Sequence, residues 1–155
     1  MLKNFRKVAI GLLFVILQIV IFRHLEFYQM QPDVVLVFLL WVMVTSNRFS
    51  AIIITAIISF IQDTLLDLWG VHMFSKTLTV FMVYNFVPRA EPKRLSITQI
   101  FLTILVLALI NNIIFVGVNS FIDAYNASIY FWRIWVGNSI YTAIMGVFIY
   151  MFYAD

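Results

Sequence analysis

Apolar runs long enough to cross or nearly cross a lipid bilayer follow one another along almost the whole chain. Hydrophobic residues make up 64% of the 155 residues and charged residues only 11%, whereas a soluble domain carries roughly 25% charged residues. The polar stretches between the runs are too short to fold as a second domain. The sequence therefore predicts an all-α integral membrane protein in which residues 1–155 form a single membrane domain.

Six transmembrane helices are expected, because a spanning helix needs about 20 mostly apolar residues. Their approximate ranges are 5–22, 32–46, 50–68, 71–87, 97–121 and 130–153. Pro32 suits the first turn of the second span, where a missing N–H is tolerated, and Pro88 closes the fourth span. An even number of spans places both termini on the same side of the membrane.

Basic residues indicate which side that is. On the side of the membrane that holds the N-terminus, the basic residues that flank the helix ends are Lys3, Arg6, Lys7, Arg48, Arg89, Lys93 and Arg94. On the opposite side they are Arg23 and Arg133. The positive-inside rule then predicts that both termini are cytoplasmic. The first span reads as an uncleaved signal anchor, because no small-residue cleavage site follows Phe22.

Two acids and two bases interrupt the apolar background between residues 62 and 76. Asp63 and Asp67 are four residues apart, as are His72 and Lys76, so each pair shares one helix face. Charged groups at membrane depth are costly and are treated as functional candidates by default. The segment is therefore the first place to look for a site.

A tight hairpin is expected between the third and fourth spans, because little more than Trp69 and Gly70 joins them. Residues equally far from this turn then lie at the same depth. The spacing predicts an Asp63–Lys76 pair, with Gln62 and Thr77 beside it, and it places Asp67 level with His72.

These groups could lock the hairpin or could relay protons or ions. A relay needs further titratable groups along a path, and no other span offers one at mid-depth. An aspartyl protease dyad is disfavoured because Asp63 and Asp67 lie on one helix. With no cysteine and no ligand spacing between His24 and His72, we expect no catalytic, cofactor-binding or metal-binding residues.

Other polar positions within the spans are typical of helix contacts. Asn138, Thr142 and Gly146 follow one another at intervals of four residues in the sixth span, and Asn112 lies in the fifth. Small and polar residues let membrane helices approach one another closely. We expect these four positions to contact other helices of the chain or a partner. Basic residues gather only at the membrane edges, so nucleic acid is not an expected partner.

A family likeness covers nearly the whole chain. It runs through a basic N-terminal stub and first span, Pro32-Asp33 before a Val/Leu-rich second span, Gln62-Asp63, Gly70-Val71-His72, and a basic loop before the fifth span. In these features the chain resembles the MreD family of the bacterial rod-shape system. Lys76 departs from the usual pattern of that family, in which an apolar or small residue would be less surprising.

The resemblance implies a location in the bacterial cytoplasmic membrane and a six-helix fold similar to the substrate-binding components of energy-coupling-factor transporters. It also implies a non-enzymatic scaffold in the cell-elongation machinery, which binds an MreC-like single-span protein and helps organise peptidoglycan synthesis. Its indirect partners would be the actin-like MreB filament and a glycosyltransferase–transpeptidase pair. The alternative is a vitamin-type binding subunit of a transporter, in which the segment from Ile122 to Ile129 could cover a small cavity.

Overall fold

A computed structural model describes residues 2–22, 24–25, 28, 30–88, 96–122 and 131–154. These residues form six α-helices and two short π-helical segments. The elements are α1 (Leu2–Leu17), η1 (Gln18–Phe22), α2 (Val34–Thr45), α3 (Arg48–Leu66), α4 (Val71–Val83), α5 (Ile97–Ile122), η3 (Arg133–Gly137) and α7 (Asn138–Ala154). The helical class predicted from the sequence is thus confirmed for the described residues.

Within the described part of the chain, four stretches are long and apolar enough to cross a membrane: Asn4–Phe22, Arg48–Leu66, Ile97–Phe121 and Arg133–Phe152. The remaining two helices, α2 and α4, are apolar but have only 12 and 13 residues. At 1.5 Å per residue each is about 20 Å long, which is shorter than a hydrocarbon core of about 30 Å. The expected second and fourth spans are therefore the short ones.

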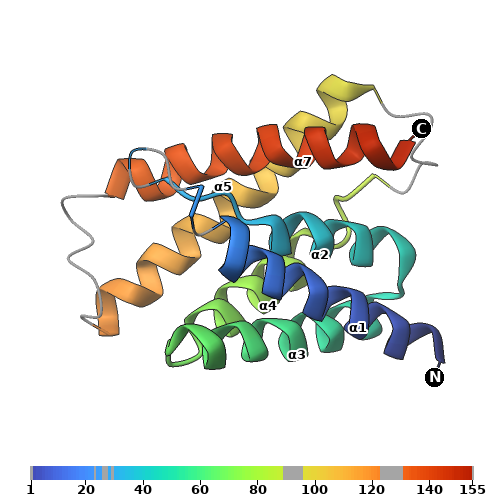
Figure 1. The fold of residues 1–155 in the computed structure, drawn as a ribbon, viewed down its shortest axis with the longest axis horizontal. Coiled ribbons are helices and arrows are strands. Elements are labelled where there is room, and N and C mark those ends of the chain that lie inside the picture. Colours follow the sequence, from blue (N-terminus) through green and yellow to red (C-terminus); the bar gives the residue numbers. More distant parts are fainter. Residues whose placement is uncertain are drawn as a thin grey trace.

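The helices pack in two groups. Helix α3 makes its most extensive contact with α4, and α5 makes its most extensive contact with α7, while contact between α4 and α5 joins the groups. Figure 1 shows that α1 begins and α7 ends at the same end of the molecule, and that the turn between α3 and α4 lies at the opposite end. These ends are called the terminal end and the hairpin end below.

Helix α2 lies at the centre of the apolar core. Seven of its residues are buried, and they pack against apolar residues of α1, α3, α4 and α5. Helix α1 approaches this core closely at Gly11, where a Cβ atom would collide with the side chain of Ile58 on α3. A smaller cluster of Ile100, Ile104 and Ala143 joins α5 to α7.

The α3–α4 hairpin turns where the sequence places it. Helix α3 ends at Leu66 and α4 begins at Val71. Asp67 and Gly70 both adopt the left-handed conformation, with φ values of 56° and 81°. Glycine adopts this conformation without strain, so Gly70 allows the short reversal.

Parts of the predicted topology fall outside the described residues. These parts are Arg23, the basic residues Arg89, Lys93 and Arg94, and residues 123–129 of the connection proposed to cover a cavity. The structure therefore leaves the predicted charge asymmetry and the covering segment as predictions.

Candidate functional site

The polar centre of the molecule is an ion pair between α2 and α4. Lys76 is fully buried, and its Nζ lies 2.8 Å from Oδ2 and 3.0 Å from Oδ1 of Asp33, the residue that caps the start of α2. Nζ also donates to Oε1 of Gln62 on α3 at 2.7 Å. A buried charge is tolerated when it is paired and hydrogen-bonded. One lysine thus connects three helices near the hairpin end.

Asp63 does not take the role expected from its depth. Its carboxylate accepts hydrogen bonds from the backbone N–H groups of His72 at 3.0 Å and Met73 at 2.8 Å. Gly70, the N-cap of α4, has no side chain with which to cap these groups. Asp63 therefore caps α4 from α3 and places a negative charge at the positive end of the helix dipole. The expected Asp63–Lys76 pair is corrected to Asp33–Lys76.

The second expected rung does not form either. Asp67 is exposed and ends α3. The His72 ring is partly buried and stacks on Phe115 of α5, with 4.7 Å between the ring centroids. Thr77, expected beside Gln62, has a buried hydroxyl without a hydrogen-bond partner among the described residues. Within the sequence-predicted cluster, a side-chain hydrogen bond joins Gln62 and Lys76.

The non-helical segment before α2 is tied down by side chains from both sides. Gln18 of η1 donates to the Pro32 carbonyl and accepts from the Val34 N–H, both at 2.8 Å. Two residues from the opposite side accept from this backbone: Asn138 from Gln31 N–H at 3.0 Å, and Thr142 from Asp33 N–H at 2.9 Å. Backbone groups without helical partners must be satisfied within protein at membrane depth. Asn138 and Thr142 are therefore internal contacts in this structure.

The other two predicted contact positions also face inward. Asn112 on α5 donates to the Ser139 hydroxyl on α7 at 3.0 Å. A Cβ at Gly146 would lie 2.6 Å from Ile104 Cδ1 and 3.1 Å from Val37 Cγ2, so glycine lets α7 approach both α5 and α2. The polar stripe of the sixth predicted span thus joins α7 to its neighbours.

Two residues of this centre do not follow from spacing. Asp33 enters the sequence analysis only through the Pro32-Asp33 likeness. For Gln18 the sequence predicts a helix contact, whereas the structure places its side chain on the non-helical backbone before α2. A signal for Asp33 was present, because aspartate directly before an apolar run is typical of a helix N-cap. Among the described residues, no group of three or more His, Cys, Asp or Glu side chains could hold a metal ion.

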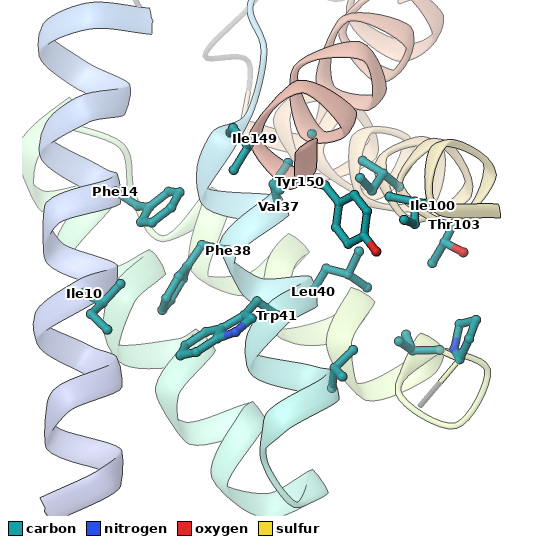
Figure 2. A pocket seen from close by; sticks show the side chains of 15 residues that line it. Ile10, Phe14, Val37, Phe38, Leu40, Trp41, Ile100, Thr103, Ile149 and Tyr150 are labelled. Carbon is teal, nitrogen blue, oxygen red and sulfur yellow. The ribbon is translucent and has the colours of Figure 1, made fainter. Parts of the chain in front are cut away.

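A cavity of about 310 Å³ lies away from the polar centre, toward the terminal end. Figure 2 shows Ile10 and Phe14 of α1 on one side, Thr103 of α5 and Tyr150 of α7 on the other, and α2 between them. The other lining residues are Val37, Phe38, Leu40, Trp41, Val44, Val87, Pro88, Ile100, Ile104, Gly146 and Ile149. The lining is almost entirely apolar, and it contains none of the ionisable residues of the polar centre.

Comparison with known proteins gives one match. The family model described as rod shape-determining protein MreD matches residues 3–155, which is essentially the whole chain. No curated protein and no solved structure matches significantly. The helical structure with several long apolar helices agrees with a multi-pass membrane protein. The chain therefore belongs to the MreD family of rod shape-determining proteins.

Proposed function

We propose that this protein is a non-enzymatic membrane scaffold of the bacterial cell-elongation machinery, in which it binds an MreC-like single-span protein. Membership of the MreD family supports a role in determining rod shape. Through its partner the protein would be linked to the MreB filament and to the glycosyltransferase–transpeptidase pair that builds peptidoglycan. It has no catalytic step of its own in this proposal.

The proposed topology has six spans with both termini in the cytoplasm. The common end of α1 and α7 in Figure 1 supports an even number of crossings. Helices α2 and α4 are shorter than the hydrocarbon core. At the hairpin end, however, the polar groups beside both helices form hydrogen bonds within the protein, so short helices are compatible with a membrane crossing. The segment before α2 keeps its backbone satisfied through Gln18, Asn138 and Thr142. It can therefore lie below the membrane surface without being helical.

The observation that carries the scaffold proposal is the use of the buried charges. Lys76 forms an ion pair with Asp33 and a hydrogen bond with Gln62. The carboxylate of Asp63 accepts hydrogen bonds from backbone N–H groups at the start of α4. Groups committed in this way brace helices instead of facing a reacting molecule. The polar centre therefore supports a rigid shape that other membrane proteins can recognise.

The vitamin-binding alternative fits the described residues less well. A small-molecule site needs a few convergent polar groups in its lining. The cavity described above is almost wholly apolar, and it lies toward the terminal end, whereas the alternative requires an opening at the opposite face. The cavity therefore favours the scaffold over a transporter subunit.

Depletion followed by complementation tests the proposal. Cells depleted of the protein should lose rod shape, and wild-type protein should restore it and co-purify an MreC-like partner. Lys76→Met should fail in both respects, whereas the adjacent Thr77→Val, which removes a hydroxyl that has no hydrogen-bond partner among the described residues, should succeed. Depleted cells that stay rods and acquire a vitamin requirement would contradict the scaffold and favour the transporter subunit.

A further inference from the structure

The cavity toward the terminal end has a floor formed by one face of α2. Val37, Leu40, Trp41 and Val44 follow the spacing of a single helix face, and all four are only partly buried although the other faces of α2 are covered. Helix α1 forms one wall, and α5 and α7 form the other, as Figure 2 shows. The cavity is therefore a gap between α1 on one side and α5 and α7 on the other, over a face of α2 that the described helices cover only in part.

The lining of the gap does not suit another helix. Helix contacts in membranes are enriched in small residues, but bulky side chains such as Phe14, Phe38 and Tyr150 line this cavity. The space at its one glycine, Gly146, is already filled by Ile104 and Val37. A flexible hydrocarbon chain can follow such an irregular apolar gap.

The terminal side of the cavity is positively charged. Nζ of Lys7 lies 5.6 Å from the centroid of the Trp41 ring and donates to the Thr45 carbonyl at 2.8 Å and the Ser46 hydroxyl at 2.6 Å. These bonds fix the ammonium beside a residue that lines the cavity. Arg6 and Arg48 are exposed at the same end of the bundle.

The acidic residues that the structure describes lie toward the opposite end. Among the described residues, the acids are Asp33, Asp63 and Asp67, and all three lie toward the hairpin end. Basic clusters beside membrane helices attract anionic lipid headgroups. The charge of the terminal end is therefore complementary to an anionic lipid.

We infer that this cavity binds an acyl chain of an anionic phospholipid, whose phosphate lies near Lys7 in the leaflet at the terminal end. The chain covers the partly exposed face of α2 and fills the gap between α1 and α7, so the lipid packs against both of these helices. The inference requires a bilayer around the terminal end, but it does not depend on the scaffold role.

Native mass spectrometry of the full-length protein tests this inference. The protein is released from nanodiscs that contain equal amounts of phosphatidylglycerol and phosphatidylcholine with identical chains. Thr103→Phe places a ring into the cavity from the α5 wall, and Val44→Phe places one from the α2 floor. Leu102→Phe is the matched control, because Leu102 is the neighbouring exposed residue of α5 and does not line the cavity. Monodisperse elution and an unchanged melting temperature identify the variants that are folded.

Wild-type protein should retain phosphatidylglycerol in preference to phosphatidylcholine. The filling variants should lower lipid retention at least roughly tenfold, because displacing two buried methylene groups already has this effect, and Leu102→Phe should leave it unchanged. Lys7→Gln should reduce the preference for phosphatidylglycerol about fivefold. Equal retention by the filling variants and the control, or no preference for the anionic lipid in wild-type protein, would overturn the inference. A dimer that the filling variants abolish would instead assign the cavity to a second copy of the chain.

Discussion

The ammonium of Lys76 on α4 lies 2.8 Å from the carboxylate of Asp33 at the start of α2, although 43 residues separate them in the sequence. Because Asp33 is also the N-cap of α2, the pair sets the depth at which α2 begins relative to α4. Gln62 holds the same ammonium from α3. The relative heights of three helices therefore depend on one buried cation.

Replacing Lys76 with methionine should strongly destabilise the protein. The substitution keeps most of the side-chain volume but leaves Asp33 without its partner, and breaking a buried ion pair in this way typically costs about 3–5 kcal/mol. Thermal unfolding in detergent measures the effect. Thr77→Val, one residue along α4, should change the melting temperature little. Equal melting temperatures for Lys76→Met and wild-type protein would show that the pair does not brace the helices.

Replacing Asp63 with alanine should weaken the hairpin without disturbing the Lys76 contacts. The change leaves the N–H groups of His72 and Met73 without their acceptor, and loss of a helix cap costs about 0.5–2 kcal/mol. Hydrogen exchange in the first turn of α4 should accelerate. The control is Asp67→Asn at an exposed position, because asparagine tolerates the left-handed conformation of this residue; it should leave exchange in that turn unchanged.

Thr142→Val tests the anchoring of the segment before α2. Valine has nearly the same shape but cannot accept the hydrogen bond from the Asp33 N–H. A buried donor left unsatisfied costs about 1–3 kcal/mol, so the melting temperature should fall. Thr64→Val supplies the comparison, because the Thr64 hydroxyl is exposed and bonds only locally to the Phe60 carbonyl. A fall of the same size in both variants would argue against the anchor.

Two glycines should respond in opposite ways to alanine. Gly70 has a φ of 81°, and the left-handed conformation costs an alanine about 1 kcal/mol or more. Gly117 lies within α5, and a Cβ there would meet no atom within 4 Å, so Gly117→Ala should leave stability unchanged or raise it slightly. Unfolding of the two variants under the same conditions compares them directly. A tolerated Gly70→Ala would mean that the turn can relax.

Sequence reasoning located the hairpin but not the correct acid for Lys76. Counting residues from Trp69 and Gly70 gave the depth of Asp63 and Lys76, and both are indeed buried. Depth alone does not show that the start of α4 needs a cap and that the Asp63 carboxylate supplies it. The residue count also compares only the third and fourth predicted spans, whereas Asp33 reaches the same depth from the start of α2.

The small and polar residues of the fifth and sixth predicted spans are expected at contacts with other helices or a partner, and the structure places Asn112 and Gly146 between helices of the chain. The sequence left open whether Asn138 and Thr142 face a partner or the chain itself. The structure uses them on the backbone before α2, because that backbone is not helical and lacks partners of its own. The length of the non-helical segment before α2 depends on tertiary packing. The periodicity of apolar residues in the sequence carries no information on such packing.

The most direct test of the account is a pair of double-mutant cycles measured by unfolding in the same detergent. One cycle combines Lys76→Met with Asp33→Asn, which preserves a side-chain oxygen for the cap, and the other combines Lys76→Met with Asp63→Asn. The Asp33–Lys76 ion pair predicts a coupling of about 2–3 kcal/mol between these two residues and less than about 1 kcal/mol between Lys76 and Asp63. Additive effects at Asp33 together with strong coupling at Asp63 would contradict it.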